Sequence, residues 1–431
     1  MELYAKALTF AIPFFLILII IEEFAARKMK RQVNYGMDTI SSLSSGMTNT
    51  LKNLMGLSIA IVSYGWMVDK VALFHIETTW LVYVVAFIGM DFVGYWSHRF
   101  DHKINAFWNR HIVHHSSEEF NLSCDLRQSV SAIVGIYFFL YIPMAFLGVP
   151  AEVVAIVAPI HLFAQFWYHT RLIGKMGFLE YILVTPSHHR VHHAINDVYL
   201  DKNLSQVFIF WDKLFGTFQE ELAEEPPVYG VKKPVNTWNP LIINYTHMWA
   251  LIMDAWRTKN WWDKARIWFM PTGWRPADVA EKYPWNYWKN AFDQVKYDSR
   301  PSKSLQVWSW VQLVVGFAMV FHVLVAFVSF QYLEVMLYSI FLMVSIFAYT
   351  SLMDKSKMAI PAEIIRFAMG MGLIYWNGGW FGLQEFLPGA TLLVSVFFML
   401  SLVLTFRFIA TEGKKLKSVS IGTRHYLNFD S

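Results

Sequence analysis

An apolar stretch close to the thickness of a bilayer opens the chain and limits the folds available to it. It runs from Tyr4 to about Ile21, and the basic cluster Arg27, Lys28, Lys30 and Arg31 follows directly. About 20 mostly apolar residues in a helix span the hydrocarbon core of a membrane. No small-residue cleavage site follows, so the stretch is predicted to be a retained anchor rather than a signal peptide. Loops rich in Lys and Arg stay in the cytoplasm, which places the N-terminus outside.

Eight further apolar runs of similar length follow. They cover residues 47–68, 79–96, 129–148, 152–169, 305–328, 332–351, 361–381 and 388–407. The sequence therefore predicts an all-α polytopic membrane protein with about nine transmembrane helices. Composition agrees, because 55% of the residues are apolar and only 16% are charged. A net charge of +4 gives no reason to expect a nucleic-acid partner, and a single cysteine, Cys124, allows no internal disulfide.

The order of the runs predicts three parts. Residues 1–78 hold the N-terminal anchor helices, and residues 79–303 form a catalytic domain that includes a long wet region from Arg171 to Lys303. Residues 304–431 hold the last membrane helices and a tail with Lys414, Lys415 and Lys417. Counting spans from an outside N-terminus puts that basic tail in the cytoplasm, as the charge rule requires.

Histidines gather in spaced groups at the ends of predicted spans. His98 and His102 form the first, His111, His114 and His115 the second, and His189, His192 and His193 the third, with His169 at the end of the fifth span. A spacing of three or four residues puts imidazoles on one helix face. The topology brings all nine to the cytoplasmic face of the membrane. Because neutral imidazole is the commonest metal ligand, this number of histidines predicts a site for two metals.

The number of histidines and the absence of other cofactor motifs limit the reactions that this site could catalyse. Many imidazoles favour a pair of redox metals that activates oxygen over a zinc hydrolase site, which needs few ligands. The sequence has no haem-attachment cysteine pair and no Gly-rich dinucleotide fingerprint, so electrons must come from a separate donor or a small reductant. A metal transporter is an alternative, although its ligands usually lie near the bilayer midplane. A purely structural metal site is a third interpretation.

The histidine pattern resembles that of the fatty acid hydroxylase and sterol desaturase superfamily of membrane non-haem di-iron enzymes. Neighbouring segments are similar to the alkylglycerol monooxygenase branch of this superfamily. They are 114–123 (HHSSEEFNLS), 126–128 (LRQ), 165–170 (QFWYHT), 185–193 (TPSHHRVHH), 201–203 (DKN), 211–218 (WDKLFGTF), 228–231 (VYGV) and 234–240 (PVNTWNP). The likeness is good from about residue 91 to residue 240 and thinner through the C-terminal spans.

This resemblance implies a reaction and its cofactors. It implies oxygenation of the carbon next to the ether oxygen of an alkylglycerol, with dioxygen, two iron ions and tetrahydrobiopterin, followed by release of a fatty aldehyde and a glycerol. Eight histidines match the family's motifs as iron ligands, and His169 is implied as a ninth. The eight are His98, His102, His111, His114, His115, His189, His192 and His193. Hydroxylation or desaturation of a fatty acyl chain, sterol or carotenoid is the alternative within the superfamily.

Six other residues are predicted to assist. Glu118, Glu119 and Asp101 lie in or beside the histidine motifs and are assigned catalytic roles, because a carboxylate there can orient an imidazole. Arg127, Tyr229 and Trp238 are assigned to cofactor binding, with the two aromatic rings suited to stacking on a flat pterin. Topology anchoring for the arginine and ordinary interfacial packing for the rings remain open. The expected partners are a lipid taken from the bilayer and an electron donor, in a bacterial cytoplasmic membrane or an endoplasmic reticulum.

Overall fold

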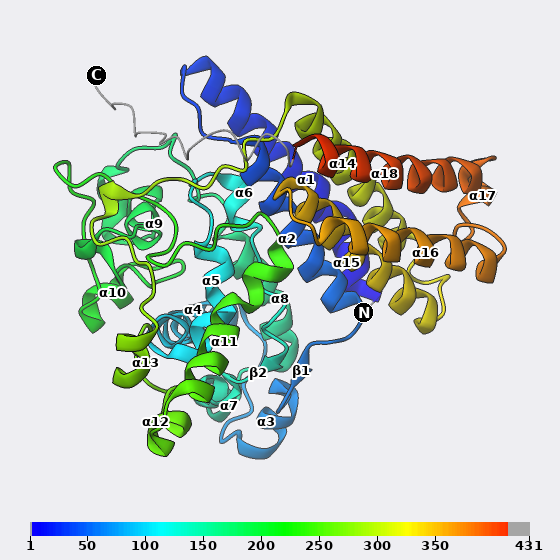
Figure 1. Cartoon of the computed structure of the whole chain (residues 1–431). Helices are drawn as coiled ribbons and strands as arrows, with labels where there is room; N and C mark the ends of the chain where they lie inside the picture. The colour runs from blue at the N-terminus through cyan, green and yellow to red at the C-terminus, as the bar shows by residue number, and fades with distance from the viewer. Residues whose placement is uncertain (1, 413–431) are drawn as a thin grey trace.

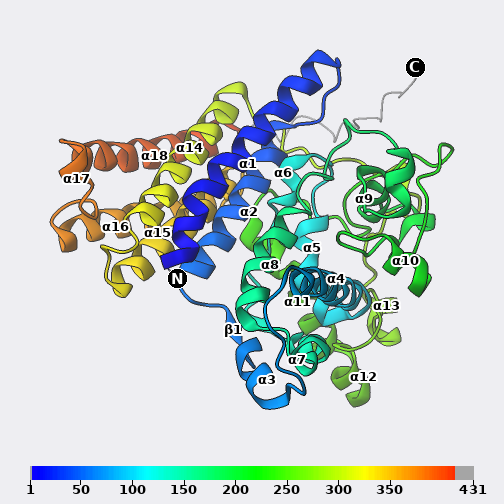
Figure 2. The same ribbon diagram turned by 180° about the vertical axis from the view of Figure 1, so that it is seen from behind.

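The computed structural model describes residues 2–412 and consists mostly of helices. Figures 1 and 2 show two groups side by side: the C-terminal helices with the first two helices, and a more irregular part that contains the histidine-bearing segments. The predicted basic tail with Lys414, Lys415 and Lys417 lies outside the described residues.

The N-terminal half combines long helices with short pieces. Its elements are α1 (Glu2–Lys28), α2 (Gly36–Leu54), β1 (Ile59–Ala60), α3 (Tyr64–Val71), α4 (Trp80–Lys103), α5 (Asn105–His115), α6 (Leu122–Asp125), β2 (Val134–Gly135), η1 (Phe138–Tyr141), α7 (Ile142–Leu147), α8 (Ala151–Phe163), η2 (Gly177–Tyr181), α9 (Pro186–His192), η3 (Asp197–Tyr199) and α10 (Phe210–Phe215). Strands β1 and β2 pair in parallel, with Ile59 opposite Val134, and form the one sheet of the described residues.

The C-terminal half is built from longer helices after an amphipathic region. Its elements are α11 (Pro240–Arg257), α12 (Trp261–Arg266), α13 (Ala277–Lys282), η4 (Ala291–Asp293), α14 (Lys303–Val325), α15 (Tyr332–Met353), α16 (Ala359–Asn377), α17 (Leu383–Phe386) and α18 (Ala390–Glu412). Helices α15, α16 and α18 pack together around Tyr338, Phe341, Trp380 and Phe398, while α2 lies against α14 and α15.

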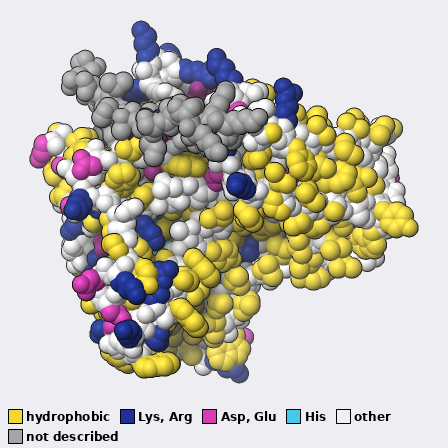
Figure 3. Space-filling model, viewed as in Figure 1, with side chains coloured by type: hydrophobic (Ala, Val, Ile, Leu, Met, Phe, Trp, Pro, Cys, Tyr) yellow, Lys and Arg dark blue, Asp and Glu magenta, His cyan; other side chains and the backbone are white. Residues whose placement is uncertain are grey.

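Five helices within residues 2–412 are long and apolar enough to cross a membrane. They are Tyr4–Lys28, Trp80–Lys103, Lys303–Val325, Tyr332–Met353 and Ala390–Glu412. Apolar side chains cover the C-terminal helices on the face that Figure 3 shows. Monomeric soluble proteins rarely expose apolar surface on this scale, so the chain is a multi-pass membrane protein.

Three of the predicted spans are not continuous membrane-length helices. The run at 47–68 is divided, because α2 ends at Leu54 and α3 begins only at Tyr64. The run at 129–148 forms β2, η1 and the six-residue α7, and the run at 152–169 contains the 13-residue α8. Hydropathy does not show whether an apolar run forms one long helix or several short elements, so it overestimates the number of continuous membrane-length helices here.

Helix α2 lies only partly inside the 47–68 run, and polar side chains in the shared part bond to other protein segments. Lys52 Nζ donates to the carbonyl of Ala132 at 3.3 Å, and Asn53 Nδ2 donates to the hydroxyl of Tyr4 at 2.9 Å. The 361–381 run does form a helix, α16, but it carries a buried ion pair between Glu363 and Arg366 at 2.6 Å, and it is not among the five.

Candidate metal centre

Nine buried or partly buried histidines form two groups in which one nitrogen of each ring can point at a common centre. The first group draws on α4, α5 and α9 and contains His98, His102, His111, His115 and His192. The second draws on α5, α9 and the segment after α8 and contains His114, His169, His189 and His193. Within each group the candidate ligand atoms lie within 4.8 Å of one another. All nine histidines predicted from the sequence are therefore brought together.

The spacing of ring nitrogens fits two adjacent metal positions. In the first group, Nε2 of His98 lies 2.8 Å from Nε2 of His111. In the second, Nε2 of His169 lies 2.8 Å from that of His189 and 3.3 Å from that of His114. The rings of His115 and His193, one from each group, stack with centroids 4.4 Å apart. The two histidine groups are therefore in direct contact.

Local helix geometry explains which histidines converge. His98 and His102 lie one turn apart on α4, as His111 and His115 do on α5, so each pair shares a face. Helix α9 begins with Pro186, whose ring suits the first helical turn. His188 turns the other way, since its Nδ1 lies 3.4 Å from the hydroxyl of Thr185. It is absent from both groups.

The protonation state of the rings suits metal binding. Burial, with repulsion from neighbouring imidazoles as a smaller cause, lowers the pKa of His111, His115 and His193 well below 6.5. A neutral imidazole keeps a lone pair for a metal. Among the described residues, the buried Nε2 atoms of His102, His115 and His192 have no hydrogen-bond partner. Buried polar atoms are rarely left unpaired, so these three nitrogens fit a metal site.

Backbone carbonyls fix the orientation of rings in the first group. Nδ1 of His98 lies 2.7 Å from the carbonyl oxygen of Leu204, and Nδ1 of His192 lies 3.0 Å from that of Lys202. Asp212 holds this segment in place, because its carboxylate accepts from the backbone N–H of Leu204 at 2.7 Å and of Ser205 at 2.9 Å. Contacts of this kind set the tautomer, leaving Nε2 for the metal.

Two carboxylates reach ligand rings. Asp125 Oδ1 lies 3.2 Å from Nδ1 of His169, and Asp201 Oδ1 lies 3.4 Å from Nδ1 of His102. Against the effect of burial, the contact with His102 and, to a smaller extent, Lys103 at 2.6 Å lower the pKa of Asp201 to about 2. Asp201 belongs to the 201–203 segment that the sequence analysis singled out, whereas Asp125 was missed. Asp125 lies far from His169 in the chain, and no motif marks it.

Asp91 serves a neighbouring polar network. Its carboxylate accepts from the backbone N–H of Val207 at 2.9 Å and of Phe208 at 3.0 Å, and from the indole of Trp211 at 3.0 Å. His161 Nε2 lies 2.9 Å from the same carboxylate. Asp91 therefore connects α4 and α8 to the loop that leads into α10, the same loop that orients His98.

Three of the six assisting residues line one cavity. Glu118, Glu119 and Trp238 lie in the wall of a hollow of about 610 Å³ that also includes Tyr35, Lys296, Tyr297 and Trp310. Burial raises the pKa of Glu118 to about 7, although the backbone N–H of Tyr297 donates to it. Glu119 is paired with Lys296 at 2.6 Å and with Arg171 at 3.1 Å.

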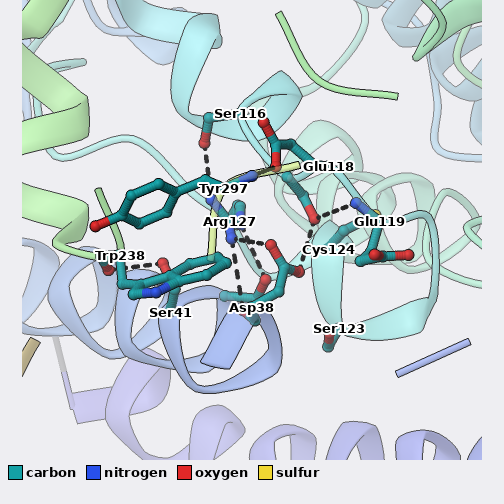
Figure 4. Close-up of polar contacts among 12 residues, drawn as sticks. Asp38, Ser41, Ser116, Glu118, Glu119, Ser123, Cys124, Arg127, Trp238 and Tyr297 are labelled. Atoms are coloured by element: carbon teal, nitrogen blue, oxygen red, sulfur yellow. Dashed lines mark hydrogen bonds and ion pairs between the residues drawn. The ribbon is translucent and has the colours of Figure 1, made fainter. Parts of the chain in front are cut away.

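The other three lie elsewhere. Arg127 is 1% exposed and donates to Asp38 at 2.6 Å and to Ser116 at 2.9 Å, as Figure 4 shows, so its guanidinium binds protein groups. Tyr229 stacks on Phe120 with centroids 5.1 Å apart, and the Phe120 ring in turn packs against the second histidine group. Asp101 accepts a 2.5 Å hydrogen bond from the hydroxyl of Tyr137 and lies in neither histidine group.

Comparison with known proteins shows to which class of enzymes this membrane protein with two adjacent histidine groups is similar. Residues 83–217 match the family model of the fatty acid hydroxylases, and this segment contains all nine histidines. The chain is 34% identical to alkylglycerol monooxygenase of Homo sapiens over 366 residues, which cover 83% of this chain and 80% of the human protein. The Xenopus tropicalis enzyme is 31% identical over 83% of this chain and 79% of its own length.

The chain therefore belongs to the alkylglycerol monooxygenase family and is an oxygen-dependent monooxygenase. It is also 26% identical over 136 residues to the ornithine lipid hydroxylase OlsE of Rhizobium tropici, covering 31% of this chain and 41% of that protein. No solved structure matches the chain.

Proposed function

We propose that this protein is a membrane di-iron lipid monooxygenase that cleaves the ether bond of alkylglycerol lipids. The observation that carries the proposal is the pair of histidine groups with unpaired buried nitrogens, in a chain similar along most of its length to alkylglycerol monooxygenases. One atom of dioxygen enters the C–H bond next to the ether oxygen, and the other leaves as water with two electrons and two protons from a reductant. The resulting hemiacetal collapses to a fatty aldehyde and a free glycerol hydroxyl.

The chain's own residues provide the setting for this reaction. Iron, when bound, supplies the activation of dioxygen. Five imidazoles are placed to hold one ion and four to hold the other, and the neutral rings add no charge to the site. Burial of the histidines excludes bulk water. The neighbouring apolar helices give a lipid chain a route from the bilayer, with its glycerol head left at the interface.

A small reductant is the second part of the proposal. The cavity of about 610 Å³ lies beside the residues that follow the second histidine motif, and its wall combines aromatic rings with carboxylates. Trp238 and Tyr297 offer ring faces, and the Glu118 carboxylate offers an acceptor for N–H groups, while Glu119 is already held by Lys296 and Arg171. A tetrahydropterin has both a flat ring and such donors, so we assign it to this cavity.

Iron content and product formation test the proposal together. Purified protein is assayed for iron by mass spectrometry and for fatty aldehyde release from a 1-O-alkylglycerol under ¹⁸O₂, with and without tetrahydrobiopterin. Two irons per chain, ¹⁸O in the aldehyde oxygen before exchange, and dependence on the pterin are the expected results. Iron-loaded protein that leaves the ether lipid intact would contradict ether cleavage.

The reductant site has its own matched test. Trp238→Leu is expected to raise the KM for the pterin several-fold and to leave the KM for the lipid unchanged. Trp249→Leu removes an exposed indole on α11 outside the cavity and is the control. Equal effects of both variants on the pterin KM would remove the cavity from the mechanism.

A second candidate substrate follows from the match to OlsE. Because that relative is named an ornithine lipid hydroxylase, hydroxylation of a lipid acyl chain without bond cleavage is the alternative for the same metal centre. Hydroxylated acyl product from an ornithine lipid, with no aldehyde from the ether lipid, would establish it.

A further inference from the structure

An arginine near the end of α18 interrupts an otherwise apolar, lipid-facing stripe. Leu400, Val403 and Arg407 follow one another at helical spacing, and all three are exposed. Within residues 2–412, no carboxylate pairs with the Arg407 guanidinium. A charge on the lipid side of a membrane helix is costly unless it reaches the interface or meets an opposite charge.

A cavity of about 460 Å³ lies beside this arginine, between the start of α14 and the end of α18. One part of its wall is polar and the other apolar. The polar residues are Ser302, Ser304, Arg407, Thr411 and Glu412, and the apolar ones are Val307, Trp308, Leu404 and Phe408. A wall divided in this way matches a molecule with a polar head and a hydrocarbon chain.

The charge that remains unpaired in the cavity wall is positive. Its one acid, Glu412, is already engaged with Lys355 Nζ at 3.1 Å and with the backbone N–H of Ser302 at 3.3 Å. Arg407 is therefore the charge without a partner. The N-terminus of the 23-residue helix α14 adds partial positive charge at the same end, next to the exposed Lys303.

We propose that this cavity binds one anionic phospholipid. The phosphate lies against the Arg407 guanidinium, and an acyl chain runs along Val307 and Leu404. Ser304 and Thr411 complete the polar end, with their hydroxyls bonded to Ser302 Oγ and to the carbonyl of Arg407. The apolar half of the wall favours a lipid over a free phosphate, because it continues into the lipid-facing stripe of α18. This site is separate from the histidine groups, and its proposal does not depend on the oxygenase reaction.

The position of the site gives the lipid a structural role. Arg300, Pro301 and Gln306 line the larger cavity with Trp238, while Ser302 and Ser304 line this one, so residues 300–306 form a wall between the two. Lys355 reinforces that wall, since its Nζ donates to the carbonyl of Arg300 at 2.7 Å as well as to Glu412.

Lipid binding to the full-length protein in detergent tests the proposal. The probes are phosphatidylglycerol, phosphatidylcholine with the same acyl chains, and inorganic phosphate, and the readouts are native mass spectrometry and thermal unfolding. One phosphatidylglycerol per chain should remain bound and raise the unfolding temperature, while phosphatidylcholine and phosphate should do neither. Arg407→Gln should weaken phosphatidylglycerol binding about five- to tenfold.

Three variants separate a specific site from general surface attraction and from misfolding. Lys28→Gln removes an exposed charge at the end of another membrane helix and should leave binding unchanged. Arg407→Lys keeps the charge and should restore most of the binding. Val307→Trp fills the apolar half from an exposed position and should weaken lipid binding. Equal binding of phosphatidylcholine, an equal effect of phosphate, or unchanged binding by Arg407→Gln overturns the proposal.

Discussion

Replacing Arg127 distinguishes a structural arginine from a cofactor-binding one. The side chain is 1% exposed, and besides Asp38 and Ser116 its guanidinium donates to Ser42 Oγ at 2.9 Å. Within residues 2–412, Asp38, itself 3% exposed, keeps only its side-chain hydrogen bond from Ser117 when the arginine is removed. Leaving a buried carboxylate without its partner costs about 3–5 kcal/mol. Arg127→Met should therefore lower the free energy of unfolding by that amount.

Titration with a denaturing detergent at fixed lipid content measures this free energy. Asp38→Asn combined with Arg127→Met should recover part of the loss, with a coupling of about 1–3 kcal/mol, because the second change removes the unpaired charge. Arg127→Lys should be intermediate, since a lysine cannot reproduce the fork of three hydrogen bonds. If Arg127→Met kept full stability and instead raised the KM for the reductant, the cofactor role predicted from the sequence would stand and the structural argument would fail.

Three further predictions concern the metal centre and pH. His193→Ala should reduce bound iron by about one ion per chain, whereas His188→Ala should not; equal iron loss in both would contradict the two-group arrangement. Asp125→Asn should weaken iron affinity about 10- to 100-fold through His169, measured as iron retained against a chelator, and unchanged retention would remove Asp125 from this role. Burial raises the pKa of Asp354 to about 6. The folded state therefore favours the protonated carboxyl, and ionisation of Asp354 destabilises the protein as the pH rises from about 4 to 6. Asp354→Asn should be more stable than the parent above pH 6, by at most about 3 kcal/mol, and should lose that advantage near pH 4; a constant difference across this range would refute the assignment.

The histidine centre was predictable because its information is local. Pairs such as His98 with His102 lie one helical turn apart, so the sequence alone shows that they share a face. How nine rings divide into groups of five and four depends on how α4, α5 and α9 meet, which no spacing encodes. The same limit hides Asp125, whose contact with His169 arises only from tertiary packing.

The number of membrane helices was less predictable because apolar residues serve two purposes. The run at 47–68 is apolar enough to suggest a span, yet Lys52 and Asn53, in its α2 part, hydrogen-bond to other segments of the protein. The cofactor-binding roles of Arg127 and Tyr229 stay predictions. Both side chains contact protein groups, and a polar or aromatic residue beside a motif can face a ligand or the core, so only the packing decides. Trp238, by contrast, does line a cavity with Glu118 and Glu119.

Helix α9 has a consequence for how the protein assembles. It contributes His192 to one histidine group and His189, with the adjoining His193, to the other. Metal ions in both groups would act as two crosslinks between α9 and the α4–α5 region, closing a loop of roughly 90 residues and lowering the entropy of the unfolded chain. In a protein whose single cysteine allows no internal disulfide, iron would then crosslink segments that are distant in the chain, and losing one ion would lower the stability of the fold.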